Sequence, residues 1–163
     1  MQTLLTPWRF KYISMSDEQA ECFFCQAAAD PRDDARLVVW QGTHFLVMLN
    51  RFPYTNGHLM VAPLAHQSDP AQSDPAAREG FWPLVLRCQA ALQQLYSPDG
   101  FNMGLNLGRA AGAGVPGHYH FHIVPRWEGD TNFMTVLGDV RLVPEEPEQV
   151  LVKLRPILAA EEC

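Results

Sequence analysis

The sequence predicts an α+β fold in which a sheet packs against one long helix. Short segments rich in Val, Leu and Phe lie on both sides of a single stretch whose apolar residues recur at three- and four-residue spacing. The chain has 163 residues, of which 47% are hydrophobic, enough to fill one core. We therefore expect residues 1–163 to form a single domain, with residues 1–21 and 134–163 as extensions.

Three antiparallel strands are expected in the first half of the chain. Residues 37–41 and 44–50 are rich in β-forming side chains and are joined by two residues, a connection typical of a hairpin. Residues 58–62 follow a turn-rich break and read as the third strand.

The long helix is expected to begin after Asp74, with Pro75 in its first turn, and to end near Tyr96. Residues 101–107 then alternate apolar and polar side chains, which indicates a fourth strand. Near the C-terminus, residues 144–158 begin with acidic side chains and continue with a weak apolar stripe, which favours a second helix.

Charge and hydropathy exclude two classes of partner. The net charge is −6 and the 12 Lys and Arg are scattered, so the chain lacks the basic patch of a nucleic-acid-binding protein. No apolar run approaches the ~18 residues of a membrane span, and the N-terminus has no signal-peptide form. We expect a cytoplasmic protein that binds the phosphate of a small molecule and contacts neither nucleic acid nor membrane.

Three histidines, His118, His120 and His122, alternate with apolar residues in a segment that Pro125 is expected to end. In a strand this spacing places the imidazoles on one face, about 6.6 Å from one to the next, and an apolar surface on the other. They could be the polar face of a half-exposed strand, or zinc ligands. They could also act on phosphorus, since neutral imidazole is a nucleophile near pH 7, and the glycine-rich residues 108–117 offer backbone N–H groups to phosphate.

Cys22 and Cys25 form a Cys-x-x-Cys pair. Two thiolates at this spacing can share a zinc ion with two further ligands, can form a redox pair, or can remain buried free thiols. The redox interpretation needs a strand before the pair and a helix after it, and the polar residues 16–21 do not supply that strand.

His-Tyr-His-Phe-His-Ile-Val, residues 118–124, resembles the motif of the histidine triad (HIT) family, and Gly57-His58 resembles that family's glycine-His strand. The resemblance extends from about residue 22 to residue 126. Residues 7–9 and 129–133 look like the bacterial subgroup related to diadenosine tetraphosphate phosphorylases and hydrolases.

The resemblance implies an antiparallel sheet of five strands with one long helix and a C-terminal helix, and a homodimer with two-fold symmetry. It also implies cleavage at the α-phosphate of an adenine nucleotide, with His120 as nucleophile and His122 at the phosphate or the leaving oxygen. To favour attack, we expect the other ring N–H of His120 to donate to a backbone carbonyl. The residues expected to bind the nucleotide are Asn50, His58, Asn106, Gly108, Gly112, Gly114 and Val115.

Two further features follow from the resemblance. Many members carry a Gln and a Ser or Thr shortly before the triad. This chain instead has a loop of Gly, Ala, Val and Pro at residues 112–117, so backbone N–H groups must make more of the contacts with phosphate. Some bacterial members join a Cys pair to two histidines, which here implies one structural zinc at Cys22, Cys25, His66 and His118. No organic cofactor is expected.

The function expected is a hydrolase or phosphorylase acting on diadenosine polyphosphates through a nucleotidyl-histidine intermediate. The alternatives are an adenosine 5′-phosphoramidate hydrolase and a zinc-stabilised nucleotide-binding module without turnover.

Overall fold

The structure is a computed structural model that describes residues 21–132, 137 and 143–160. Five strands form one antiparallel sheet in the order β1-β2-β3-β5-β4. The strands are β1 (Val38–Gln41), β2 (Phe45–Leu49), β3 (Leu59–Pro63), β4 (Gly100–Leu105) and β5 (Phe121–Arg126). The helices are α2 (Phe23–Ala29), α3 (Pro75–Tyr96) and α5 (Pro147–Ala160), with 3-10 turns η1 (Asp34–Arg36), η2 (Pro70–Gln72) and η3 (Arg109–Ala111).

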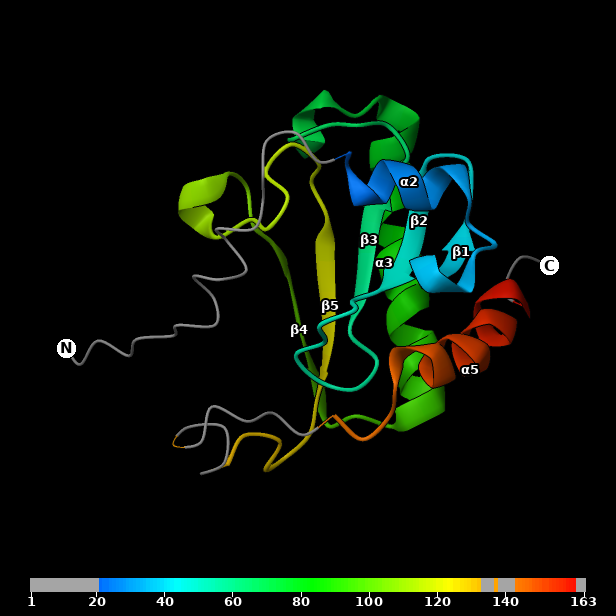
Figure 1. Ribbon diagram of the computed structural model, residues 1–163, viewed down its shortest axis with the longest axis vertical. Helices are drawn as coiled ribbons and strands as arrows, with labels where there is room; N and C mark the ends of the chain where they lie inside the picture. The colour runs from blue at the N-terminus through cyan, green and yellow to red at the C-terminus, as the bar shows by residue number, and fades with distance from the viewer. Residues whose placement is uncertain (1–20, 133–136, 138–142, 161–163) are drawn as a thin grey trace.

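The helices cover the two faces of the sheet unequally (Figure 1). Helices α3 and α5 pack on one face, where they share a core with Val47, Val61 and Ile123. The short helix α2 lies on the other face above a smaller apolar cluster that includes Phe24, Met60 and Ala62. The expected α+β architecture is confirmed.

The register of β5 against β3 determines which way the histidine segment faces. Met60, which belongs to the cluster under α2, is paired with His122, so that imidazole points to the α2 face. The neighbouring pair, Val61 and Phe121, faces α3 and belongs to the main core. The expected division into a histidine face and an apolar face is therefore confirmed.

The histidine segment differs from the expected strand at both ends. The ladder of β5 begins at Phe121, so only His122 lies in it, while His118 and His120 precede it. The prediction of three imidazoles in one row along a strand is therefore wrong for His118 and His120, although both rings pack against Phe24 of α2 and so lie on the same face as His122. At the other end Pro125 lies inside the strand, because β3 pairs only as far as Ile123 and proline's missing N–H removes no bond on that side.

Helix α3 begins and ends as the sequence predicts. The side chain of Asp74 accepts a hydrogen bond from the N–H of Ala77 at 2.7 Å, and Pro75 occupies the first turn. Gly57, just before β3, has a φ of +76° and packs so closely that an added Cβ would lie 2.9 Å from Leu92 of α3. Glycine at this position allows the loop before β3 to reach the sheet next to the helix.

Most of the expected N-terminal extension, residues 1–21, lies outside the described residues, as does the part of the C-terminal extension before residue 143 other than Leu137. The described part of that second extension forms α5, which continues through Pro156. None of the described helices combines the length and apolar character that crossing a bilayer requires.

Candidate functional site

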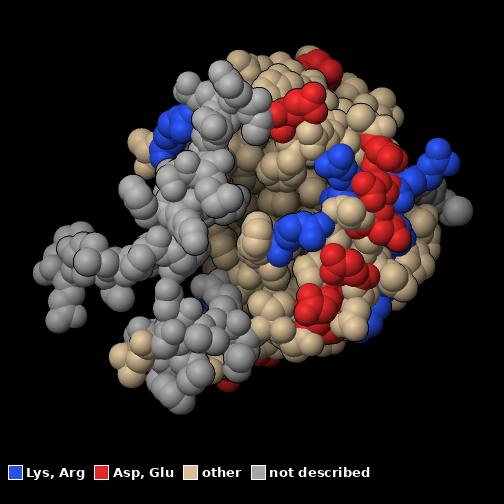
Figure 2. All heavy atoms as spheres, in the orientation of Figure 1, with Lys and Arg blue, Asp and Glu red and all other residues tan. Residues whose placement is uncertain are grey.

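A pocket of about 360 Å³ opens on the α2 face of the sheet, a size typical of small-ligand sites. Figure 2 shows that face of the molecule hollowed beside α2. The wall of the pocket is formed by α2, the loop after β2, the loop before the triad and the start of β5. The lining residues that can contact a ligand through polar groups are Arg36, Asn50, Arg51, Tyr54, Asn106, His120 and His122.

His120 is held as the tautomer that nucleophilic attack requires. Its Nδ1 lies 3.0 Å from the backbone oxygen of His118, and because a carbonyl can only accept, Nδ1 carries the ring proton. Nε2 therefore has the lone pair. The expectation that a backbone carbonyl fixes this tautomer is confirmed.

His122 is held in the opposite tautomer by a chain of two hydrogen bonds. The backbone N–H of Tyr54 donates to Nδ1 of His58 at 3.2 Å, so the proton of His58 is on Nε2. That nitrogen lies 2.9 Å from Nδ1 of His122, which must accept, and the proton of His122 is therefore on Nε2. Nε2 of His122 is therefore a hydrogen-bond donor, whereas Nε2 of the neighbouring His120 has a lone pair. The two rings meet edge to face, with their centroids 4.9 Å apart.

Burial favours the neutral form of these rings. Burial, together with a smaller effect of positive charge on His120, lowers the pKa of His122 to about 4. Burial also lowers the pKa of His120, partly opposed by its bond to the carbonyl of His118. Without nucleotide, the imidazoles of His120 and His122 are both uncharged at neutral pH.

The residues expected to bind nucleotide are not all at the pocket surface. The structure brings Asn50, Asn106 and residues 112, 114 and 115 together in the wall with His120 and His122. His58 is fully buried behind His122, and Gly108 is also not part of the wall. His58 therefore acts on the pocket through His122 rather than by direct contact.

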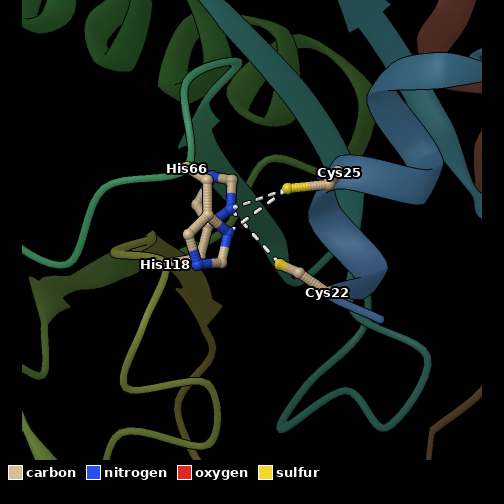
Figure 3. A group of neighbouring side chains, drawn as sticks. All are labelled: Cys22, Cys25, His66 and His118. Carbon is tan, nitrogen blue, oxygen red and sulfur yellow. Dashed lines mark hydrogen bonds between the residues drawn. The ribbon is translucent and has the colours of Figure 1, made fainter. Parts of the chain in front are cut away.

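The predicted metal ligands form one compact group. The ligand atoms of Cys22, Cys25, His66 and His118 all lie within 4.8 Å of one another. Figure 3 shows the two thiols reaching from the start of α2 towards the two imidazoles, which come from the loops after β3 and before β5. Sγ–Nδ1 distances are 3.3 Å for Cys22–His118, 3.3 Å for Cys25–His66 and 3.6 Å for Cys25–His118.

This donor set fits a tetrahedral zinc ion. Bonds of about 2.0 Å to nitrogen and 2.3 Å to sulfur separate neighbouring ligand atoms by roughly 3.5 Å, close to the distances between the thiols and the rings. The Nε2–H of His118 donates to the carbonyl of Pro63 at 2.8 Å, which leaves the Nδ1 lone pair directed at the thiols. Gly117 lets His66 approach, since an added Cβ would lie 3.3 Å from its Nε2.

Sequence reasoning missed helix α2 and three of its contributions to the site. Phe23 and Ala27 line the pocket, and the ring of Phe24 packs against His118 and His120. The two phenylalanines between the cysteines could have predicted these contacts. Aromatic side chains next to metal ligands are expected to pack against the same histidines that the cysteines approach. Tyr54 was also missed. Its backbone N–H, which almost any residue type could supply, donates to His58, and its ring packs against His58 and His122.

The fold and this arrangement of histidines define the class of protein. Residues 32–129 match the HIT domain, and the chain belongs to the HIT family.

Relatives extend the similarity to nearly the whole chain. The AP-4-A phosphorylase of Mycobacterium tuberculosis is 33% identical over 168 residues, covering 99% of this chain and 84% of that protein. The crystal structure of a zinc-bound histidine triad family protein from Mycobacterium smegmatis is 28% identical with a TM-score of 0.68, covering 87% of this chain and 96% of that one. A histidine triad nucleotide-binding protein from Sulfolobus tokodaii, 24% identical with a TM-score of 0.68 over 85% and 93% of the two chains, shares the fold.

Proposed function

We propose that the protein cleaves diadenosine polyphosphates at an α-phosphate through a nucleotidyl intermediate on His120, and that phosphate is the second acceptor. The observation that carries the proposal is the tautomer of His120, whose Nδ1–H is bound to the carbonyl of His118 and whose Nε2 lone pair belongs to a residue of the pocket wall. The 33% identity to an AP-4-A phosphorylase supports this substrate class.

In the first step the Nε2 lone pair of His120 forms a bond to the α-phosphorus, and the bond from phosphorus to the bridging oxygen breaks. The remaining nucleoside polyphosphate departs as an anion with the electron pair of that bond. His120 keeps its Nδ1 proton, and the carbonyl of His118 stabilises the positive charge that the ring acquires.

His122 would assist as a hydrogen-bond donor. Its Nε2–H, fixed by the chain from Tyr54 through His58, is suited to a phosphate oxygen on which negative charge develops. A polyphosphate can leave with only this donor, whereas the amine released from an adenosine 5′-phosphoramidate must gain a proton. This difference makes diadenosine polyphosphate the favoured substrate of the two.

The second step transfers the adenylyl group from His120 to an acceptor. Among the residues that the structure describes in the pocket wall, none is an aspartate or a glutamate, so this part of the site supplies no carboxylate to remove a proton from water. Inorganic phosphate already carries a negative oxygen and can attack without such a base. Phosphorolysis is therefore the proposed outcome, with hydrolysis as the slower alternative.

We also propose that Cys22, Cys25, His66 and His118 hold one structural zinc ion. Four protein ligands leave no open position for substrate, so the ion would fix α2 to the loops before β5 and after β3 rather than polarise a phosphate. Thiols kept as ligands suit a reducing compartment, which supports the cytoplasmic location expected from the sequence.

The same proposal includes a homodimer. The edge of β1 is covered by α5, from which Arg155 donates to the carbonyl of Val38 at 3.0 Å, whereas β4 forms the other edge of the sheet. Trp82 is 51% exposed and packs its ring against Phe121, next to β4, so apolar surface lies beside that edge. Pairing of two β4 edges would give the two-fold dimer, and sedimentation velocity would detect it.

The partners expected are small nucleotides. On the face shown in Figure 2, acidic and basic side chains are interspersed, a distribution unlike the continuous basic surface that tracks a nucleic-acid backbone.

The decisive experiment is product analysis with diadenosine tetraphosphate in the presence and absence of phosphate. The proposal predicts ADP and ATP with phosphate and a slow reaction without it. AMP and ATP at an equal rate in both conditions would indicate a hydrolase. Binding without products would indicate the nucleotide-binding module, and turnover of the phosphoramidate alone would indicate the other alternative.

A further inference from the structure

Helix α2 contributes to two sites at once. Cys22, the residue just before α2, and Cys25, in its first turn, reach to the metal cluster. Phe23 and Ala27, from the same seven-residue helix, form part of the pocket wall. A shift of this helix therefore cannot change the cluster without changing the pocket.

Phe24 joins the two sites through its ring. It is completely buried, and its centroid lies 5.1 Å from that of His118, a ligand of the cluster, and 4.8 Å from that of His120, the nucleophile. One side chain thus packs against both imidazoles, and it belongs to the apolar cluster that includes Met60, the partner of His122 in the sheet.

His118 provides a second connection. Its side chain faces the thiols, and its backbone oxygen accepts the Nδ1–H of His120. A shift of the backbone at residue 118 would therefore move both a ligand of the cluster and the carbonyl that fixes the tautomer of His120.

We propose that Phe24 is a positioning residue that couples the Cys/His cluster to the pocket, so that a metal ion at the cluster and an adenine nucleotide in the pocket strengthen each other's binding. The inference rests on the proposed function, because it takes the pocket to be the nucleotide site. It goes beyond that function in making the two sites interdependent.

The physical reason is the marginal stability of the linking helix. A helix of seven residues is too short to be stable by itself, so its position depends on what its ends and its buried face contact. Metal bonds at Cys22 and Cys25 would fix one end, and a nucleotide against Phe23 and Ala27 would fix the neighbouring surface. Each ligand reduces the cost of ordering that the other must overcome, and the coupling must be equal in both directions.

The test measures zinc release from the zinc-loaded full chain to an excess of a chromogenic chelator, with and without saturating AMP. AMP is the probe because it carries the adenosine and α-phosphate that the proposed site would bind and has no polyphosphate to release. We expect AMP to slow release about fivefold or more, the lower end of the range for coupling between sites. In the reverse direction, zinc-loaded protein should bind AMP more tightly than protein treated with chelator, and calorimetry measures that ratio.

Two matched substitutions separate coupling from general loss of packing. Phe24→Leu keeps an apolar side chain under α2 but removes the ring that touches both imidazoles, and it should reduce the effect of AMP on zinc release to less than twofold. Phe45→Leu makes the same change on the opposite face, where Phe45 is also buried and its ring packs against Phe81. This control should retain the full effect of AMP.

The outcomes are distinct. Equal zinc release with and without AMP in a protein shown to bind both ligands would overturn the coupling while leaving the proposed function intact. Loss of the AMP effect in both Phe45→Leu and Phe24→Leu would remove Phe24 from the role assigned here. Failure of AMP to bind the zinc-loaded protein at all would instead contradict the proposed function, and absence of zinc from the purified chain would contradict the metal site.

Discussion

Burial of His122 should make the folded protein lose stability in acid, and His122→Asn should remove that loss. Burial lowers the pKa of His122 from its ordinary value of 6.5 to about 4. Above pH 6.5 the ring is neutral in both the folded and the unfolded chain and contributes nothing to the pH dependence. As the pH falls from 6.5 towards 4, the unfolded chain takes up a proton that the folded chain does not, so the free energy of unfolding decreases.

The magnitude follows from the size of the shift. One pKa unit corresponds to about 1.4 kcal/mol, so between pH 7 and pH 4.5 His122 alone should cost roughly 2 kcal/mol of folding free energy after allowance for its partial contact with solvent in the pocket. Burial also lowers the pKa of His118 and His120, which adds to the total acid loss in the same direction. Those contributions are common to the wild type and the variant.

The assay is urea denaturation of both proteins at pH 7 and pH 4.5. Asparagine is the suitable replacement because its side-chain oxygen can accept from His58 as Nδ1 of His122 does, while the amide cannot take up a proton. The wild type should lose about 2 kcal/mol more than His122→Asn between the two pH values. The control, His44→Asn, removes a histidine whose side chain is 38% exposed, and it should not remove the acid loss. An equal loss of folding free energy in acid by the wild type and by His122→Asn would refute the reasoning. Any release of metal in acid affects both proteins equally, so it does not change the difference between them.

Three further substitutions test other parts of the structure. Cys25→Ser should abolish stoichiometric zinc, measured by metal analysis of protein purified without chelator, and lower the melting temperature; about one zinc per chain retained by the variant would exclude the site. Phe24→Ala should cost about 3–5 kcal/mol in urea denaturation because it empties a fully buried ring position, and a loss below 1 kcal/mol would show that the ring is not packed as described. Gly57→Ala should destabilise by roughly 1–3 kcal/mol, since alanine is strained at a φ of +76° and its Cβ approaches Leu92; unchanged stability would contradict that conformation.

The sheet and α3 could be predicted because their signals are local. The capping residues Asp74 and Pro75 define the start of α3, and the alternating residues 101–107 identified β4, whose described bounds end slightly earlier at Leu105. Helix α2 could not be predicted in this way. Its seven residues complete fewer than two turns, and the sheet beneath it and the cluster at its start, rather than its own periodicity, determine its position.

The site shows the same division between local and tertiary information. The motif predicted that His120 and His122 would lie together at the site, but it could not predict the position of His58. Whether that imidazole reaches a phosphate or a neighbouring histidine depends on how β3 is aligned with β5, and the pairing of Met60 with His122 places it behind the pocket wall. His118 shows a related effect: it precedes the ladder of β5, and the carbonyl of Pro63 together with Cys22 determines where its buried ring lies.

The central claim is that His120 takes up the nucleotidyl group, and trapping that adduct tests it most directly. Diadenosine tetraphosphate labelled at the α-phosphate would be mixed with enzyme without phosphate, quenched in base to preserve the phosphorus–nitrogen bond, digested and analysed by mass spectrometry. We predict one adenylyl group on His120 of the wild type, and loss of this adduct when phosphate is added before the quench. His120→Ala and His120→Gly should form no adduct and show no turnover. An adduct on a different residue, or turnover by His120→Ala at most of the wild-type rate, would contradict the account.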